Sequence, residues 1–127
     1  MKIEHIALFV NDLEQSREFY TRYFGARANG KYTNSKTGFE SYFLTFDSGA
    51  RLEIMTLPEV KLSPREPMCA GYAHIAVSAG SREAVDALTQ RLASEGEIVI
   101  SPPRVTGDGY YESVVLDCDG NRIEITE

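Results

Sequence analysis

The chain has 127 residues, 43% of them hydrophobic and 25% charged, which is enough for one compact domain but too few for two independent ones. Its formal net charge is −6 and its Lys and Arg residues are not clustered, so we do not expect a nucleic-acid partner. No apolar run approaches the roughly 18 residues that span a bilayer, and the N-terminus lacks the order of a signal peptide, so we expect a cytoplasmic protein with no membrane partner.

The first half opens with a predicted strand that starts at His5, and a predicted helix follows. Asp12 can cap this helix, with Gln15 three residues on as in a capping box, and Gly25 supplies the stop. Its apolar face consists of Leu13, Tyr20 and Phe24. A hairpin of two strands, Ser41–Phe46 and Arg51–Thr56, is predicted after the helix.

The segment between this helix and this hairpin contains candidate ligand-contacting residues. The polar stretch Lys31–Gly38 is a candidate lid. The aromatic residues that follow it are explained equally well as strand residues or as walls of a ligand pocket, and they are Phe39, Tyr42 and Phe43.

A stretch with no steady period separates the two halves. It is punctuated by Pro58, Pro64 and Pro67, so we interpret residues 58–70 as a linker. The halves are then residues 1–57 and 71–127, which we expect to share one core as modules of a single domain.

The second half repeats the order of the first. A strand is predicted around His74, then a helix capped by Ser81 and ended by Gly96, with an apolar stripe formed by Val85, Leu88 and Leu92. A second hairpin is predicted from Ser113–Leu116 and Arg122–Thr126. Before it lie a second candidate lid, Thr106–Gly109, and two aromatic residues that are candidate pocket walls, Tyr110 and Tyr111. The pattern is βαβββ twice.

Two anchors show that the halves are repeats. The only two histidines, His5 and His74, both open the tripeptide His-Ile-Ala. The segment Asp47–Ile54 resembles Asp117–Ile125, which carries one extra turn residue. The His–Glu separation is 48 positions in the first half and 50 in the second, which indicates an internal duplication.

The repeat predicts a metal site. Glu53 alternates with Leu52 and Ile54 along its strand, so it points away from the face that the helix covers, and Glu124 alternates with its neighbours in the same way. A single histidine on a strand usually has a structural role, and a glutamate that alternates with apolar residues usually lies on a solvent-exposed face. The presence of equivalent residues in both halves favours instead a role that they share. We therefore predict a divalent first-row metal held by His5, Glu53, His74 and Glu124. Cys69 and Cys118 form no CxxC pair and are expected to be reduced thiols.

At these residues the chain resembles the vicinal-oxygen-chelate superfamily over its whole length. The resemblance rests on three segments, namely His5-Ile6-Ala7, Gly71-Tyr72-Ala73-His74-Ile75-Ala76 and Asp117-Cys118-Asp119-Gly120-Asn121-Arg122-Ile123-Glu124. The family usually has proline where Cys118 stands. The resemblance implies an α+β fold in which two βαβββ modules pair curled mixed sheets around a metal-binding cleft, and it implies a homodimer.

Glu53 makes the chain most similar to glyoxalase I (lactoylglutathione lyase), which uses two His and two Glu, whereas related epimerases carry Gln there. The resemblance implies a Ni²⁺, Co²⁺ or Zn²⁺ ion, methylglyoxal detoxification through a thiol adduct, Glu124 as the base and Glu53 as its counterpart. The Arg and Asn that hold glutathione's charged ends are replaced by Phe9 and Leu57, which leaves another thiol open. The alternatives are a thiol transferase or dioxygenase-type resistance enzyme of the same superfamily, and a small-molecule-sequestering protein.

Overall fold

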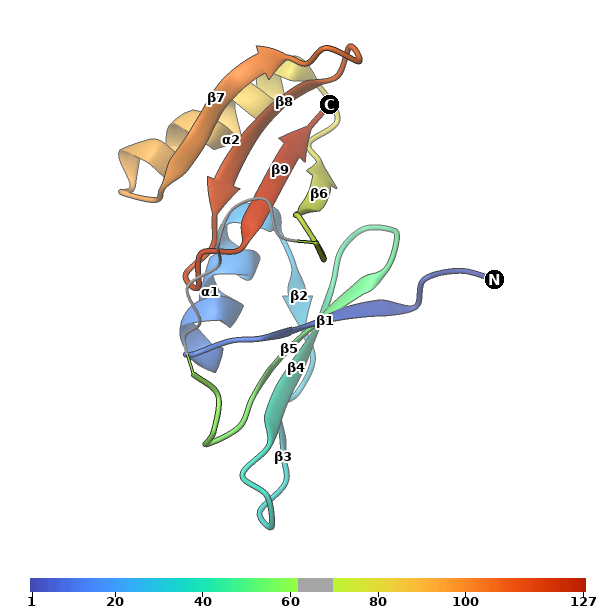
Figure 1. The fold of residues 1–127 in the computed structure, drawn as a ribbon, viewed down its shortest axis with the longest axis vertical. Coiled ribbons are helices and arrows are strands. Elements are labelled where there is room, and N and C mark those ends of the chain that lie inside the picture. Colours follow the sequence, from blue (N-terminus) through green and yellow to red (C-terminus); the bar gives the residue numbers. More distant parts are fainter. Residues whose placement is uncertain (62–69) are drawn as a thin grey trace. The chain divides into compact units, whose positions relative to one another are not determined.

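The computed structural model describes residues 1–61 and 70–127. These residues form two compact units, divided between residues 63 and 64, and each unit has one helix and one sheet (Figure 1). Most of the predicted linker, including Pro64 and Pro67, lies outside the described residues, as does Cys69. The arrangement of the two halves as one domain with a shared core stays a prediction.

The first unit contains six elements: β1 (His5–Phe9), α1 (Leu13–Phe24), β2 (Arg27–Ala28), β3 (Tyr32–Thr33), β4 (Glu40–Thr45) and β5 (Arg51–Thr56). Its sheet has the strand order β1-β5-β4-β2, and β3 also pairs with β4. The pair β1–β5 is parallel and the other pairs are antiparallel. The short strand β3 lies within the predicted lid Lys31–Gly38.

The second unit contains five elements: β6 (Ile75–Ser78), α2 (Arg82–Ser94), β7 (Val99–Val105), β8 (Tyr111–Leu116) and β9 (Arg122–Thr126). Its strand order is β6-β9-β8-β7, with β6–β9 parallel and the other pairs antiparallel. Strand for strand this is the order of the first unit. The predicted α+β fold of two βαβββ modules is therefore confirmed.

Both predicted helix starts are confirmed by their caps. The Asp12 carboxylate accepts a hydrogen bond of 2.9 Å from the backbone N–H of Gln15, and the Ser81 hydroxyl accepts one of 3.2 Å from Ala84. These bonds satisfy N–H groups that have no partner within a helix. Helix α1 ends at Gly25, which has the left-handed φ of 63° that glycine adopts readily.

Each helix covers one face of its own sheet. Helix α1 packs on β4 and β5, and α2 packs on β7, β8 and β9. The strand residues that face the helices are fully or almost fully buried and include Leu44, Leu52, Ile54, Val115, Ile123 and Ile125. The alternation predicted around both glutamates is thus confirmed. In each unit, the face of the sheet opposite the helix is called the site face below. No helix of the described residues is long and apolar enough to cross a bilayer.

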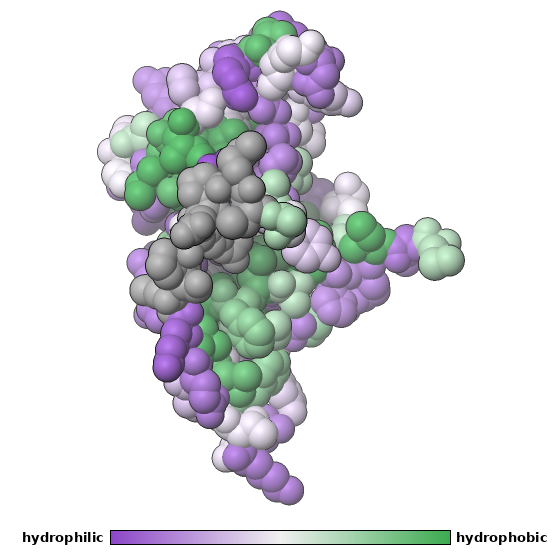
Figure 2. Space-filling model, in the orientation of Figure 1, coloured by the Kyte–Doolittle hydropathy of each residue, from purple (hydrophilic) through white to green (hydrophobic). Residues whose placement is uncertain are grey.

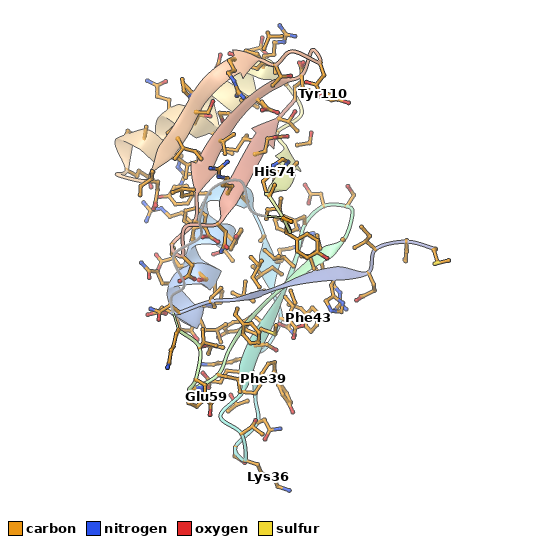
Figure 3. The ribbon with its side chains drawn as sticks, viewed as in Figure 1. Lys36, Phe39, Phe43, Glu59, His74 and Tyr110 are labelled. Atoms are coloured by element: carbon orange, nitrogen blue, oxygen red, sulfur yellow. The ribbon has the colours of Figure 1, made fainter. Side chains whose placement is uncertain are left out.

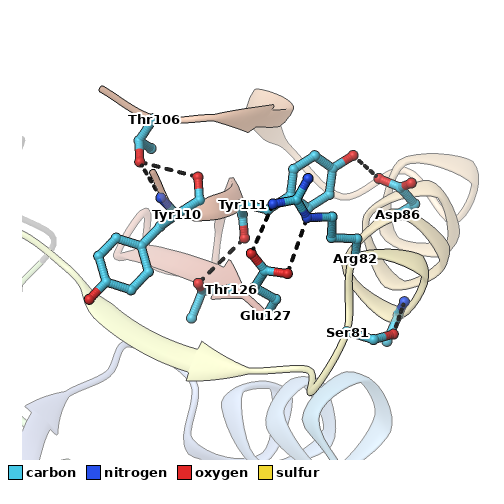
Figure 4. A network of polar contacts seen from close by, with 9 residues as sticks. Ser81, Arg82, Asp86, Thr106, Tyr110, Tyr111, Thr126 and Glu127 are labelled. Atoms are coloured by element: carbon cyan, nitrogen blue, oxygen red, sulfur yellow. Dashed lines mark hydrogen bonds and ion pairs between the residues drawn. The ribbon is translucent and has the colours of Figure 1, made fainter. Parts of the chain in front are cut away.

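Two of the aromatic residues that were candidate pocket walls face the helix of their unit and not the site face. The buried Tyr42 donates a hydrogen bond of 2.9 Å to Glu14 on α1. Tyr111 donates one of 2.6 Å to Asp86 on α2, and the guanidinium of Arg82 lies over its ring (Figure 4). Their hydroxyl groups therefore fasten each helix to its sheet.

Candidate functional site

The first His–Glu pair is set by the register of two parallel strands. His5 opens β1, and Ala7 lies directly opposite Glu53 on β5. On the other side of Glu53 the partner is Phe43 of β4. Nε2 of His5 lies 3.8 Å from Oε2 of Glu53, whose side chain is 15% exposed. The small Ala7 leaves room for these two longer side chains to meet.

The second pair repeats this register in the other unit. His74 immediately precedes β6, where Figure 3 labels it, and Ala76 lies opposite Glu124 on β9. The partner on the far side of Glu124 is Val114 of β8. Nε2 of His74 lies 3.5 Å from Oε2 of Glu124, which is 19% exposed.

Both pairs fit the coordination of a divalent ion. Two ligand bonds of about 2.1 Å separate the ligand atoms by roughly 3.0–3.4 Å at octahedral or tetrahedral angles. The separations of 3.5 and 3.8 Å are within a few tenths of an ångström of that range. Imidazole nitrogen and carboxylate oxygen both suit Zn²⁺ and Ni²⁺. Among residues 1–61 and 70–127 no three His, Cys, Asp or Glu side chains gather into one such group, so the four predicted ligands are brought together as two pairs.

His5 is held by residues that the sequence did not single out. Its Nδ1 donates a hydrogen bond to the carboxylate of Glu4, which also pairs with Arg51. The hydrogen bonds from His5 and from Arg51 lower the pKa of Glu4. Arg51 lies over the ring of Phe43 at 4.1 Å, and that ring meets His5 edge-on with centroids 5.4 Å apart. Donation from Nδ1 leaves the lone pair of Nε2 directed at Glu53.

A different group surrounds Glu124. Burial raises its pKa, the neighbouring His74 opposes this shift, and the carboxyl of Glu112 on β8 raises the pKa further. Glu112 pairs with Arg104 on β7 at 3.4 Å. Sequence analysis missed Glu112 because the strand was predicted to begin at Ser113. The signal available was the strand propensity of Tyr111, which extends the strand back by two residues and puts Glu112 on the same face as Val114.

The site face of the first unit becomes apolar beyond its His–Glu pair. Phe9 lies opposite Met55, Met55 lies opposite Ser41, and Ser41 lies opposite Tyr32. Phe9 and Tyr32 are large hydrophobic residues that are both exposed. Hydrophobic surface gathers in Figure 2 over the region where Figure 3 labels Phe43 and Phe39. Phe9, predicted to replace a glutathione anchor, thus lies on the site face, two residues further along β1 than Ala7, the partner of Glu53.

The two candidate lids are turns with hydrogen bonds of their own. Asn34 accepts a bond from the backbone of Lys36 at 3.0 Å. Thr106 accepts one from the backbone of Tyr110 at 3.0 Å and donates one to Asp108 at 2.6 Å. Movement of either turn over a ligand stays a prediction.

The family is shown by comparison with known proteins. The family model of the Glyoxalase/Bleomycin resistance protein/Dioxygenase superfamily matches residues 2–125. The chain is 30% identical over 127 residues to the uncharacterized protein YqjT of Bacillus subtilis (strain 168), covering 97% of this chain and 96% of that one.

Solved structures of related proteins share the fold. A structure from Bacillus cereus, described as a possible glyoxalase, is 29% identical with a TM-score of 0.75, covering 100% of this chain and 99% of the other. Glyoxalase I from Zea mays is 21% identical with a TM-score of 0.81, and 98% of this chain matches 44% of the maize chain. This chain thus spans less than half the length of the maize enzyme. The duplicated modules and the family match agree, and the chain belongs to the Glyoxalase/Bleomycin resistance protein/Dioxygenase superfamily.

Proposed function

We propose that the protein is a metal-dependent lyase of the glyoxalase I type. It converts the hemithioacetal of a 2-oxoaldehyde and a thiol into the thioester of a 2-hydroxy acid. The observation that carries the proposal is the duplicated His–Glu pair, with Nε2–Oε2 separations of 3.8 and 3.5 Å. His5, Glu53, His74 and Glu124 are the residues that would hold a Ni²⁺, Co²⁺ or Zn²⁺ ion.

The reaction is an isomerisation that needs a base and a stabilised oxyanion. When bound, the ion would supply positive charge that stabilises developing negative charge on oxygen. The Glu124 carboxylate takes the proton from carbon 1, and the electrons of that C–H bond form the double bond between carbons 1 and 2 as the carbon 2 carbonyl electrons move to oxygen. Glu124 then returns the proton to carbon 2, and the hydroxyl proton of the carbon 1 oxygen moves to the carbon 2 oxygen, so carbon 1 becomes the thioester carbonyl and carbon 2 carries the hydroxyl group. Oxidation at carbon 1 balances reduction at carbon 2, so no external oxidant is needed.

The surroundings of the two glutamates support Glu124 as the base. Burial and the nearby Glu112 carboxyl raise the pKa of Glu124, and a raised pKa suits a group that must accept a proton near neutral pH. Both glutamates have uncharged cross-strand partners, Ala7 and Phe43 for Glu53 and Ala76 and Val114 for Glu124, so the Glu112 carboxyl is what distinguishes the surroundings of Glu124. We assign Glu53 the role of counterpart ligand across the ion.

The thiol is proposed to differ from glutathione. Exposed Phe9 lies on the site face beside the first His–Glu pair, where a phenyl ring cannot bind a carboxylate as a guanidinium does. Leu57 likewise offers no polar side chain after β5. We therefore expect glutathione to be a poorer partner than a thiol with fewer charges. We also expect a cytoplasmic protein that works as a homodimer, and light scattering coupled to gel filtration tests the dimer.

The first experiment measures metal content and then thioester formation. The purified protein is analysed for bound metal, loaded with Ni²⁺ or Zn²⁺, and assayed with methylglyoxal and glutathione, cysteine or 2-mercaptoethanol. We expect stoichiometric metal and thiol-dependent lactoyl thioester. Bound metal without thioester for any thiol would reject the lyase and favour a resistance enzyme, and no metal at all would reject the site.

Glu53→Gln separates the lyase from the other enzymes of the superfamily. A lyase that uses Glu53 as a ligand loses about 100-fold or more of its activity. A thiol transferase or dioxygenase with three protein ligands keeps nearly intact metal binding in this variant. Glu59→Gln is the matched control, because Glu59 is exposed and lies beyond the end of β5 (Figure 3).

A further inference from the structure

The pairing of strand β7 with β8 is irregular. Val99 lies opposite Val115, but Ser101 lies opposite Val114 and Arg104 opposite Glu112, so the pairing shifts twice along β7. The irregular stretch contains Pro102 and Pro103, which cannot donate a ladder hydrogen bond. Bulges of this kind redirect a side chain and are frequent beside active sites. Here the shifts bring Arg104 opposite Glu112.

Arg104 and Glu112 form a pair that is unequally exposed. The guanidinium Nη2 lies 3.4 Å from Oε1 of Glu112, and the two side chains are 49% and 10% exposed respectively. A carboxylate this deeply buried is costly unless it is paired with a cation. The buried end of the pair is therefore the anion, and its solvent-facing end is the cation.

The pair continues a line of charged groups across the sheet. His74 precedes β6, Glu124 lies on β9, Glu112 on β8 and Arg104 on β7, in the order in which the strands pair (Figure 1). Glu112 lies two residues from Val114, the partner of Glu124, and Arg104 lies opposite Glu112, so all three side chains share the site face. Neighbouring strands are about 4.8 Å apart, and Glu124 lies two residues along β9 from Thr126, the partner of Glu112, so Arg104 and Glu124 are roughly 12 Å apart at the backbone. Their long side chains can reach toward a single small molecule.

We propose that Arg104, held by Glu112, forms a subsite for a carboxylate carried by the 2-oxo part of the substrate. The inference rests on the proposed function, since it places the reacting carbons at the His–Glu pairs. A carboxylate two methylene groups from those carbons spans about 5 Å and then needs one hydrogen bond of about 2.8 Å to reach a guanidinium. The substrate class is therefore a 2-oxoaldehyde that bears a second, anionic end.

The position of Arg104 in the second unit corresponds to Tyr32 in the first, which lies opposite Ser41 as Arg104 lies opposite Glu112. The first unit has exposed Phe9 and Tyr32 beyond its His–Glu pair, and the second has a cation. A guanidinium suits an anionic acyl portion, which an apolar surface does not.

The test measures binding to the metal-loaded protein by calorimetry and needs no turnover. The probes are 2-hydroxyglutarate, its 5-methyl ester and lactate, which share the 2-hydroxy acid group and differ in the second carboxylate. We expect the wild-type protein to bind 2-hydroxyglutarate about 10- to 100-fold more tightly than the ester or lactate, because a hydrogen-bonded charge pair is gained. Equal binding of the three probes would overturn the proposal without any variant being made.

The variants then identify the residue. Arg104→Gln should reduce the preference for 2-hydroxyglutarate over lactate to about threefold or less, and Arg104→Lys should keep part of it, because Lys keeps the charge but not the planar fork. The matched control is Arg27→Gln, which removes an exposed Arg of the first unit that pairs with Asp47. A full preference retained in Arg104→Gln would reject this subsite.

Failure of the inference and failure of the proposed function give different results. If the protein is not a lyase, no thioester forms from methylglyoxal or from 4,5-dioxovalerate, the 2-oxoaldehyde that corresponds to 2-hydroxyglutarate. The binding preference for 2-hydroxyglutarate is still measurable in that case. If only the subsite is wrong, thioester forms but methylglyoxal and 4,5-dioxovalerate react with similar kcat/KM.

Discussion

The carboxylate of Glu4 accepts a hydrogen bond from Nδ1 of His5, and this bond determines which ring nitrogen can bind a metal. Arg51 holds Glu4 in place through its side chain, and the backbone N–H of Arg51 donates a bond of 3.1 Å to the Glu4 carbonyl. In the second unit Ala73 precedes His74 and provides no carboxylate. The two halves are thus unequal in how firmly they orient their histidine.

Replacing Glu4 should therefore weaken metal binding. We expect Glu4→Gln to lower the affinity for Zn²⁺ about 10- to 100-fold, because loss of a carboxylate that orients a histidine ligand has an effect of this size. Calorimetric titration of the metal-free protein measures it, with Glu59→Gln as a control for the same change of charge. Nitrogen-15 NMR of the two histidines gives a second readout, since the His5 ring should change tautomer while His74 does not. Equal affinities in both variants would contradict the assigned role.

The alanine beside each glutamate should matter for the site but not for folding. Ala76→Leu places a larger side chain opposite Glu124 and should lower metal affinity about tenfold, because ligands tolerate displacements of only about 0.5 Å. The free energy of unfolding should change by about 0.5 kcal/mol or less, because the position is exposed. Ser78→Leu, on the same strand and the same face, is the control. If both variants bind metal like the wild type, the alanine is not required for space.

A buried hydroxyl pair in the second unit should contribute measurably to stability. Thr89 donates its hydroxyl proton to the Val85 carbonyl at 2.7 Å and lies 2.6 Å from the hydroxyl of buried Ser113, which must then be the donor to Thr89. Thr89→Val leaves the Ser113 donor without an acceptor and should cost about 1–3 kcal/mol in urea unfolding. The double variant with Ser113→Ala should cost less than the sum of the single changes. Additive costs would show that the two hydroxyl groups act independently.

The Cys118 thiol should be slow to react at neutral pH. Burial raises its pKa to about 11, and the carboxylates of Asp117, Glu97 and Asp119 add to the shift. The thiolate is the reactive form, so at pH 8 only about one thiol in a thousand is reactive, and the rate should rise about tenfold per pH unit up to about pH 11. Alkylation by iodoacetamide, followed by mass spectrometry of the Cys118 peptide, measures this, with glutathione as the reference thiol. A rate that levels off near pH 9 would contradict the shift.

Much of the fold and both His–Glu pairs could be predicted from the sequence, because the signals are local. The caps at Asp12 and Ser81 depend on bonds to residues three positions along the chain. The outward direction of Glu53 and Glu124 follows from the period of two in a strand. The duplication then indicated that the two His–Glu pairs share a role, although it gave no distances between their side chains.

Tertiary structure alone decided what surrounds each pair. Arg51 lies beside Glu4, 47 positions away, and Arg104 lies opposite Glu112 because β7 shifts its register twice. Cross-strand neighbours depend on register and on bulges, and neither is encoded by a local period. The sequence by itself thus determined the repeated modules and the repeated His–Glu pairs. Only the paired strands decided that one histidine is held by a carboxylate and that one glutamate has a half-buried ion pair as its neighbour.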